Sequence, residues 1–252
     1  MELGRIIAVP IKSRPEFPFG ITDWLVDEFW VDDNSTILDL GAGTGKLIPR
    51  TKAAHPKKII SVDPEESMLK ELQKKYPTVE TLVGSATQIP LPDESIDLIL
   101  CGNSFHWFAN PKALQEMHRV LKPRGALGLV WNVRDESVPW VEKINKLLDK
   151  YRAGTPSFNS WEWAQLFPGH GFQKARYCAF PFAHCSVPEN AIYKMVFSLS
   201  YMCTLSEEEK ETVKAELDKI TETVPRVQNT NQIKFPYQTM AFSIEKECPK
   251  KA

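Results

Sequence analysis

An apolar strand that runs directly into a glycine-rich turn is the feature that most constrains this chain. Residues 37–40 are typical of the end of a buried strand, and Gly41, Gly43 and Gly45 follow at once. Glycine has no Cβ, so it permits a tight turn and lets a ligand approach the backbone closely. The sequence predicts a helix beginning near Lys46, whose unpaired N–H groups would face that ligand.

The spacing of the turn decides between three kinds of ligand. A P-loop needs Gly-x-x-x-x-Gly-Lys-Ser/Thr, but Leu40 occupies the first glycine position and Leu47 the hydroxyl position. A dinucleotide fingerprint needs Gly-x-Gly-x-x-Gly, and Lys46 stands where its third glycine belongs. Asp39, at the mouth of the turn, would repel a pyrophosphate but attract an ammonium group, directly or through water. The turn therefore favours a cationic amino-acid ligand, and the dinucleotide interpretation stays open as the weaker one.

Strands and helices alternate after the turn as far as residue 131. We expect strands over residues 37–40, 58–62, 79–83, 96–100 and 126–131, with helices over about 46–54, 64–76 and 110–121. Such alternation predicts right-handed βαβ units and a doubly wound, mostly parallel sheet with helices on both faces. Further strands over 172–182 and 232–245 complete an expected seven-stranded, Rossmann-like α/β fold.

Polar and glycine residues gather at the carboxyl ends of the expected strands, where ligands of such sheets bind. They are Gly41, Asp63, Ser85, Asn103 and Asn132. Asp63 follows Gly41 by about 20 residues, the separation at which a carboxylate reaches a pair of ribose hydroxyls. The alternative for Asp63 is a plain helix cap, because aspartate is a common helix start.

The parts outside the alternating region predict a lid and a cap. Residues 1–34 are expected to form a proline-rich lid segment and one helix, and residues 35–252 a single domain. A helical cap insertion is expected over about 135–169, where Trp161 and Trp163 either line an acceptor pocket or hold the cap together. Later helices are expected over 188–201 and 206–223, the second with a capping box of Ser206 and Glu209.

Composition excludes several classes of partner. The 252 residues suffice for one core with an inserted cap, and the formal net charge of -1 gives no positive field to attract nucleic acid or anionic lipid. No segment reaches the roughly 18 apolar residues of a membrane span. The five cysteines and five histidines form no ligand-spaced cluster, so no metal site is predicted. We expect a cytoplasmic monomer or weak homodimer with a small-molecule partner.

Several segments, in this order and spacing, resemble the class I S-adenosylmethionine-dependent methyltransferases. They are Asp39-x-Gly41-x-Gly43-x-Gly45, Val62-Asp63-Pro64, Gly84-Ser85-Ala86, Ser104-Phe105-His106-Trp107-Phe108, Arg119-Val120-Leu121-Lys122-Pro123 and Trp131-Asn132. The likeness covers about residues 35–135, and the later part is similar to a small-molecule branch that includes trans-aconitate methyltransferase-like enzymes. The resemblance implies S-adenosylmethionine as cofactor and S-adenosylhomocysteine as product.

The resemblance also implies roles for individual residues. The amino-acid end of the cofactor would contact Asp39, Gly41 and Gly43, and its carboxylate would bind Arg14. The nucleoside end would contact Asp63 through the ribose, and Met68, Ser85 and Ala86 through adenine, while Asn103 would lie near the methyl donor. Ala42, Pro64 and Ser104 complete the expected cofactor-binding set. Met68 has a plain core position as its alternative.

The chemistry of a sulfonium methyl group limits what the protein must supply. The group is already activated, so in-line displacement needs mainly alignment, worth roughly 7 to 11 kcal/mol in ideal intramolecular cases. A carboxylate acceptor is already a nucleophile, whereas a hydroxyl or amine would profit from His106 as general base. A structural histidine beside Trp107 is the alternative. Arg134 would pair with an anionic acceptor, and Trp107, Trp131 and Asn132 are the other expected acceptor contacts.

The sequence therefore predicts a methyltransferase that acts on an oxygen atom of a small molecule. Three alternatives stay open at this point. They are a methyltransferase acting on nitrogen, sulfur or carbon, a protein that binds the cofactor without turnover, and an NAD-dependent oxidoreductase.

Overall fold

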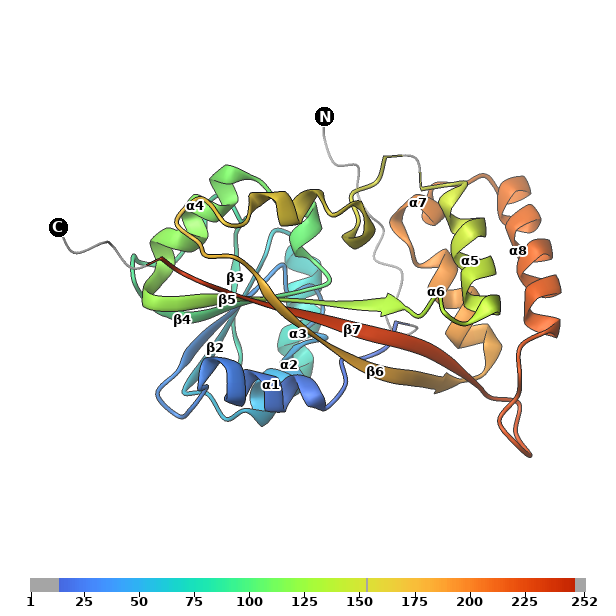
Figure 1. Cartoon of the computed structure of the whole chain (residues 1–252), viewed down its shortest axis with the longest axis horizontal. Coiled ribbons are helices and arrows are strands. Elements are labelled where there is room, and N and C mark those ends of the chain that lie inside the picture. The colour runs from blue at the N-terminus through green and yellow to red at the C-terminus, as the bar shows by residue number, and fades with distance from the viewer. Residues whose placement is uncertain (1–13, 153, 248–252) are drawn as a thin grey trace. The chain divides into compact units, whose positions relative to one another are not determined.

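Seven strands form one sheet in the computed structural model, which describes residues 14–152 and 154–247. Their order across the sheet is β3-β2-β1-β4-β5-β7-β6 (Figure 1). The strands are β1 (Thr36–Leu40), β2 (Lys58–Asp63), β3 (Glu80–Val83), β4 (Ile96–Gly102), β5 (Leu121–Arg134), β6 (Arg176–Ser186) and β7 (Ile233–Glu245). The order reverses between β1 and β4, and this reversal is where open α/β sheets bind their ligands.

The first five strands are parallel and the last part of the sheet is antiparallel. β1 pairs in parallel with β2 and β4, β2 with β3, and β4 with β5. β7 is antiparallel to β5. The Lys246 N–H donates to the Gly125 carbonyl near the start of β5, and the Asp135 N–H donates to the Pro236 carbonyl just after its end. Figure 1 shows the same reversal of β7 against β5 and β6. The predicted seven-stranded, mostly parallel sheet is confirmed.

The described residues form eight α-helices, of which α1 precedes the first strand. They are α1 (Gly20–Phe29), α2 (Ile48–Ala53), α3 (Glu66–Lys75), α4 (Pro111–Val120), α5 (Pro139–Asp149), α6 (Met195–Phe197), α7 (Ser200–Cys203) and α8 (Glu207–Glu222). The local signals act as expected: the Asn110 side chain accepts from the Ala113 N–H at the start of α4, and Ser206 and Glu209 form the predicted capping box of α8. None of the helices in residues 14–152 and 154–247 is long and apolar enough to cross a membrane.

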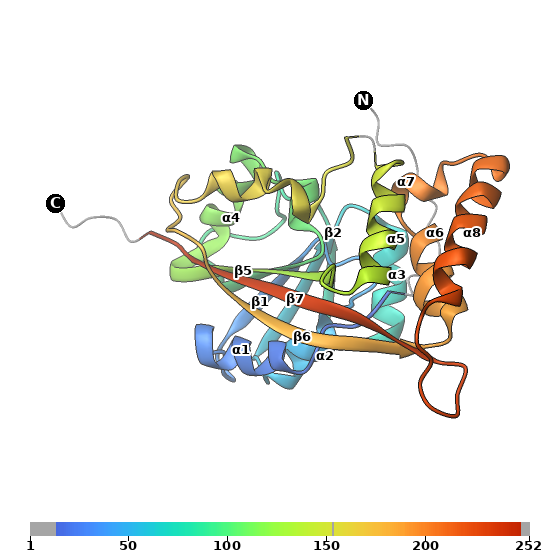
Figure 2. The same cartoon turned by 45° about the vertical axis from the view of Figure 1, so that its right-hand side comes forward.

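Alternation along the strands places apolar side chains on both faces of the sheet. Leu98 and Leu100 of β4 pack with Ile21 and Leu25 of α1 in one buried cluster, while Ile99, between those leucines, is also fully buried. α1 and α4 lie on opposite faces of the sheet (Figure 1 and Figure 2). Because both faces of the sheet are buried, the sequences of the parallel strands are runs of apolar residues with few polar interruptions.

The chain divides into two compact units. The described residues of the sheet unit fall within Glu16–Asn132, Pro156–Phe180 and Thr239–Ala252. Those of the helical unit fall within Met1–Pro15, Val133–Thr155 and Pro181–Gln238. These boundaries differ from the expected single domain with a cap over 135–169: the helical unit adds 181–238, and 156–169 packs in the sheet unit. Most of the predicted lid segment, residues 1–13, lies outside the described residues.

Aromatic packing explains why residues 156–169 belong to the sheet unit. The Trp163 ring centroid lies 4.6 Å from that of Trp131 on β5 and 4.9 Å from that of Phe242 on β7. The helical unit has its own core, in which Ile144 and Leu148 of α5 pack with Val213 and Leu217 of α8. Each unit therefore buries its own apolar surface. The role of 135–169 as a cover of the acceptor opening stays a prediction.

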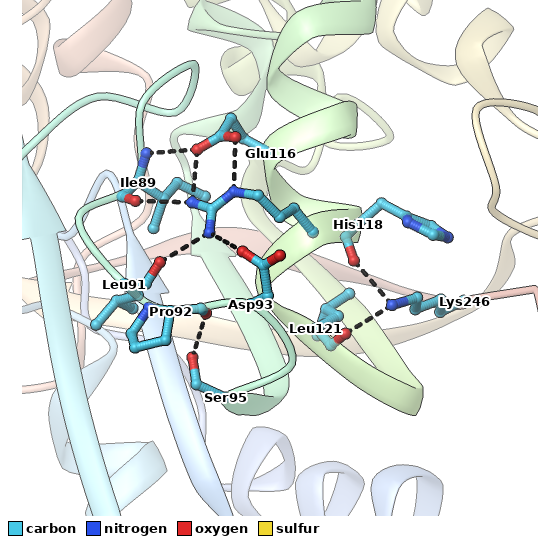
Figure 3. A network of polar contacts seen from close by, with 10 residues as sticks. Ile89, Leu91, Pro92, Asp93, Ser95, Glu116, His118, Leu121 and Lys246 are labelled. Atoms are coloured by element: carbon cyan, nitrogen blue, oxygen red, sulfur yellow. Dashed lines mark hydrogen bonds and ion pairs between the residues drawn. The ribbon is translucent and has the colours of Figure 1, made fainter.

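Arg119 of α4 ties the loop between β3 and β4 to the sheet unit. Its guanidinium donates to both Glu116 carboxylate oxygens at 2.8 Å, to the Ile89 and Leu91 carbonyls at 3.0 and 2.9 Å, and to Asp93 at 2.7 Å (Figure 3). Glu116 also accepts from the Ile89 N–H at 3.0 Å. These paired carboxylates raise the pKa of Arg119, so it stays charged.

Lys246 holds the end of the same helix. Its ammonium group donates to the carbonyls of His118 and Leu121 at 2.9 and 2.7 Å (Figure 3). These carbonyls lie at the C-terminus of α4, where the helix dipole favours a cation. The side chain is 7% exposed, so a lysine is buried here with its hydrogen bonds satisfied.

We predict that Arg119→Leu lowers the free energy of unfolding by about 1–3 kcal/mol, because it removes the guanidinium that donates to two carbonyls and two carboxylates. Urea denaturation measures the change. Lys70→Met, which removes an exposed ion pair between Lys70 and Glu66 on α3, is the matched control and should change the free energy by about 0.5 kcal/mol or less. Equal effects of the two substitutions would contradict the role given to Arg119.

Candidate functional site

The glycine turn closes on the end of β2. The N–H groups of Gly41 and Ala42 both donate to the Val62 carbonyl, at 2.8 and 3.2 Å. Gly41 has a φ of 70°, and a Cβ built there would lie 2.8 Å from the Ser104 Cβ, so no other residue fits without displacing the chain. The following helix α2 begins at Ile48, later than the expected start near Lys46.

Asp39 is a buried carboxylate with an unsatisfied oxygen. Its side chain is 1% exposed, and Oδ2 has no hydrogen-bond partner in the described part of the chain. Burial, and then the nearby charge of Asp63, raise its pKa from 3.8 to about 7. A buried charge without a partner is costly, and a cationic ligand removes that cost. The unsatisfied oxygen therefore fits the ammonium group of an amino-acid ligand at the turn.

Asp63 links the turn to the end of β2. Its Oδ2 accepts from the Gly43 N–H at 2.9 Å, and its Oδ1 accepts from the Glu65 N–H at 2.9 Å. Burial raises the pKa of Asp63 even though these two bonds oppose the shift. The N-cap of α3 is Glu65 and not Asp63, although the Asp63 bond to the Glu65 N–H lies at the start of that helix. Each carboxylate oxygen has a second lone pair, so Asp63 can accept from a hydroxyl pair as well.

The expected adenine contacts lie around the same turn. The Met68 sulfur lies 3.7 Å from a Cβ built at Gly43, so its side chain borders the turn. Ser85 and Ala86 follow β3 in the loop that Arg119 anchors, and Ser85 Oγ shares a hydrogen bond with the Thr87 hydroxyl at 3.2 Å. Pro64 is exposed between Asp63 and α3. Contact of these residues with adenine stays a prediction.

The end of β4 is joined to both neighbouring strands. The Asn103 side-chain oxygen accepts from the Asn132 N–H at 3.0 Å, and the Ser104 hydroxyl donates to the Leu40 carbonyl at 3.0 Å. Asn103 has a φ of 53°, in the left-handed region, which asparagine adopts more readily than most residues other than glycine. These bonds bring the candidate residues of β1, β4 and β5 together.

His106 accepts a hydrogen bond from Trp131. The Trp131 indole N–H donates to His106 Nδ1 at 3.0 Å. An indole nitrogen can only donate, so Nδ1 is the unprotonated ring nitrogen and the proton of the neutral imidazole is on Nε2. Trp131 is 2% exposed, whereas Trp107, whose ring centroid lies 5.2 Å from that of His106, is 44% exposed. Trp131 therefore fixes the tautomer of His106, and Trp107 offers an accessible aromatic surface.

The two predicted arginines belong to the helical unit. Arg14 donates through Nε and NH2 to the hydroxyl and carbonyl of Ser198, at 3.2 and 2.6 Å. Arg134, the last residue of β5, donates through Nε to the Asn145 side-chain oxygen. The other predicted site residues all fall in the sheet unit. Binding of the cofactor carboxylate by Arg14 stays a prediction.

Sequence reasoning missed Asn145, although a signal was present. Val141, Ile144 and Leu148 form the apolar stripe of α5, and Asn145 lies on the same stripe and is 5% exposed. A polar residue at a core position of an amphipathic helix needs a buried hydrogen-bond partner. That partner is Arg134, which follows only from the fold.

The chain is similar to known proteins in sequence and in fold. Residues 38–129 match the family model described as a methyltransferase domain. The chain is 60% identical over 238 residues to an uncharacterized methyltransferase-like protein from Schizosaccharomyces pombe, covering 94% of this chain and 93% of that protein. It is 30% identical over 240 residues to an uncharacterized methyltransferase from Mycobacterium bovis, covering 95% and 93%. The solved structure of a putative type II methyltransferase from Anaeromyxobacter dehalogenans has the same fold, with a TM-score of 0.60, 18% identity and coverage of 93% and 97%.

We predict that the affinity for S-adenosylhomocysteine rises with pH up to about 7 and then levels, by at most about tenfold per pH unit. The raised pKa keeps Asp39 neutral below about 7, and binding an ammonium group requires the carboxylate to lose its proton. Asp39→Asn should bind more weakly and lack this dependence, while Asp27→Asn, an exposed change on α1, should bind like the parent. Calorimetric titrations between about pH 5.5 and 7.5 test this. A pH-independent affinity in the parent would remove Asp39 from the site.

The raised pKa of Asp39 also affects the stability of the unliganded protein. Ligand affinity is expected to rise with pH, whereas this stability is expected to fall. A carboxyl whose pKa is raised by folding stabilises the folded state at low pH, and this contribution is lost as pH rises from 3.8 to about 7. The Asp39→Asn variant has no carboxyl to titrate at this position, so the variant keeps its stability while the parent loses some. The free energy of unfolding of the variant minus that of the parent should therefore rise by about 2 kcal/mol or more between about pH 5 and 7. Urea denaturation at both values measures the gain. A difference that shrinks with rising pH would contradict the sign.

Proposed function

Because the chain belongs to the class I S-adenosylmethionine-dependent methyltransferases, we propose that it methylates an oxygen atom of a small-molecule acceptor, with a carboxylate as the favoured group. S-adenosylmethionine supplies an activated methyl group on a sulfonium centre. An acceptor oxygen forms the new O–C bond while the C–S bond breaks and its electron pair stays on sulfur. A carboxylate acceptor yields a neutral ester and releases no proton, whereas a hydroxyl acceptor must lose one.

The hydrogen bond between Trp131 and His106 is the observation that supports a carboxylate acceptor. With Nδ1 accepting from the indole, Nε2 already holds the imidazole proton and cannot remove another from an acceptor. If the proton moved to Nδ1, the Nδ1–H would face the indole N–H of Trp131. Both groups would then be donors, and the hydrogen bond between them would be lost. His106 is therefore a donor in this tautomer, in place of the general base considered from the sequence. An acceptor that is ionised before it binds needs no base.

Each residue of the site has a role in this proposal. Asp39 and the Gly41–Gly43 backbone hold the amino-acid end of the cofactor, and Asp63 accepts from the ribose hydroxyls. Asn103 lies beside the methyl donor. His106 donates to the acceptor from Nε2, and the rings of Trp107 and Trp131, with Asn132, border the acceptor and exclude water from it.

The class of acceptor is supported by charge and chemistry. A net charge of -1 over 252 residues provides no attraction for a polyanion such as nucleic acid. This supports a small-molecule acceptor, while a cytoplasmic location and a monomer or weak homodimer stay predictions.

We predict that a panel of carboxylates, alcohols, amines and thiols gives S-adenosylhomocysteine release with carboxylates, and that the product is an ester cleaved by mild base. Because no base is needed, kcat should stay flat between about pH 5.5 and 8. His106→Gln, which supplies an amide N–H donor, should keep more activity than His106→Ala. His55→Gln, a change at an exposed histidine of the sheet unit, is the control.

Several outcomes would overturn the proposal. Turnover of alcohols or amines alone, with a rate that falls as the pH is lowered, would restore the general base. Binding of S-adenosylhomocysteine without release from any acceptor would indicate a protein without turnover.

A further inference from the structure

Ser61 is a polar residue in the middle of a buried strand. It belongs to β2 between Ile60 and Val62, and all three residues are buried. The Ser61 hydroxyl has no hydrogen-bond partner in the part of the chain that the structure describes. A buried hydroxyl without a partner lowers the stability of the fold. Alanine would fill the same position without that cost, so the hydroxyl needs an explanation other than packing.

The register of the sheet places Ser61 beside Asp39. The two residues are Cα partners in the parallel pairing of β1 and β2, as are Ile37 and Ile59 two residues earlier. Partners in a parallel register point to the same face of the sheet, so the Ser61 and Asp39 side chains are neighbours on that face. It is the face on which Ile37 packs with α1 and Ile59 packs with α2 and α3.

The unsatisfied oxygen of Asp39 is complementary to the Ser61 hydroxyl. Asp39 Oδ2 and Ser61 Oγ are both buried atoms without a hydrogen-bond partner among the described residues of the sheet unit. A hydroxyl can donate, and an ionised carboxylate can only accept. Neighbouring strands lie about 4.8 Å apart, so rotation about the Cα–Cβ bond of Ser61 can turn its hydroxyl to the carboxylate.

The strength of a bond between these atoms depends on the charge of Asp39. In the unliganded chain, burial and then the nearby charge of Asp63 raise the pKa of Asp39 to about 7, which favours the neutral acid. A cationic group at the glycine turn favours the ionised form instead. Hydrogen bonds to an ionised acceptor are stronger than those to a neutral one, so the Ser61 hydroxyl has a stronger partner when Asp39 is charged.

We propose that Ser61 is a positioning residue for the cofactor: its hydroxyl donates to the ionised Asp39 carboxylate that holds the ammonium group of S-adenosylmethionine. The inference rests on the role of Asp39 in the proposed function and adds a residue that acts through Asp39. By stabilising the carboxylate, Ser61 extends cofactor binding to lower pH. It touches neither the acceptor nor the methyl group.

Other ionisable groups lie around this pair. Those that share an electrostatic interaction with Asp39 are Asp63 at the end of β2 and the Cys101 thiol of β4. The glycine turn and the helices on this face contribute the half-buried charged residues Lys46, Glu28 and Arg50, and the remaining charged residues of α1, α2 and α3 are exposed. None of these groups changes in a Ser61 variant, so a difference between such variants reports the hydroxyl.

The test compares Ser61→Ala with the parent in calorimetric titrations of the full-length protein with S-adenosylhomocysteine, which carries the same ammonium group. We expect Ser61→Ala to bind about tenfold more weakly near pH 6, because losing a donor to a charged group raises the pKa of Asp39 by about one unit. The two affinities should converge by about pH 9, where Asp39 is ionised in both proteins. This convergence distinguishes a change in charge from a change in packing.

Two further variants serve as controls. Ser61→Thr keeps the hydroxyl and should follow the pH profile of the parent. Thr221→Val removes a buried hydroxyl in α8 of the helical unit, and it should bind like the parent at every pH. Thermal unfolding of each variant verifies that it is folded.

A second measurement needs no ligand. The raised pKa of Asp39 stabilises the folded state at low pH, and the parent loses this contribution as pH rises to about 7. In Ser61→Ala the loss should continue to about pH 8, because the folded-state pKa of Asp39 is higher still. Urea denaturation should therefore show the variant losing stability relative to the parent between about pH 7 and 8.

The outcomes separate this inference from the proposed function. A ratio of affinities that stays constant with pH would assign Ser61 to packing alone and overturn the inference, as would a Ser61→Ala profile equal to that of the parent. Ser61→Thr behaving like Ser61→Ala would also count against it. An affinity of the parent that does not change with pH would overturn the role of Asp39 and this inference together. The predicted shift in Ser61→Ala with no methyl transfer to any acceptor would overturn the proposed function alone.

Discussion

The buried carboxylate of Asp39 is the constraint on which the site depends. It lies in β1 between Leu38 and Leu40, which are both buried, so water cannot solvate its charge. In the unliganded chain the carboxyl relieves this cost by keeping its proton. A cationic ligand at the glycine turn relieves it instead by attraction, whereas a diphosphate would add to it. We propose that this one buried oxygen selects the charge of the ligand and sets the pH range in which it binds.

Parallel pairing brings the remaining residues to the same edge. Hydrogen bonds join Gly43 to Asp63 across the ends of β1 and β2, and Ser104 to Leu40 across β4 and β1. Asn103 continues the series to Asn132 on β5. Each bond uses a side chain at the last residue of a strand or just beyond it, so each depends on the register of the sheet. The cofactor site is a property of the sheet, and a shift of any one strand would alter it.

Much of this could be predicted from the sequence, and the exceptions share a physical cause. Apolar runs and the glycine turn are local signals, so the sheet and the strand ends that carry Asp63 and Asn103 follow from them. The helical unit is assembled from segments far apart in the chain, and no local pattern joins residues 133–155 to 181–238. The tautomer of His106 depends on Trp131, a partner 25 residues away that is set by tertiary packing. The position of Asn145 on the apolar stripe of α5 indicated a buried polar contact, but the sequence did not identify Arg134 as its partner.

The central claim is that the Asp39-guarded turn holds a positively charged amino-acid nucleoside. A crystal structure with S-adenosylhomocysteine tests it most directly. The account predicts the ammonium group on the Asp39 side of the turn and the ribose hydroxyls on Asp63. A nucleoside bound elsewhere, or a phosphate group preferred against Gly41 and Gly43, would contradict it.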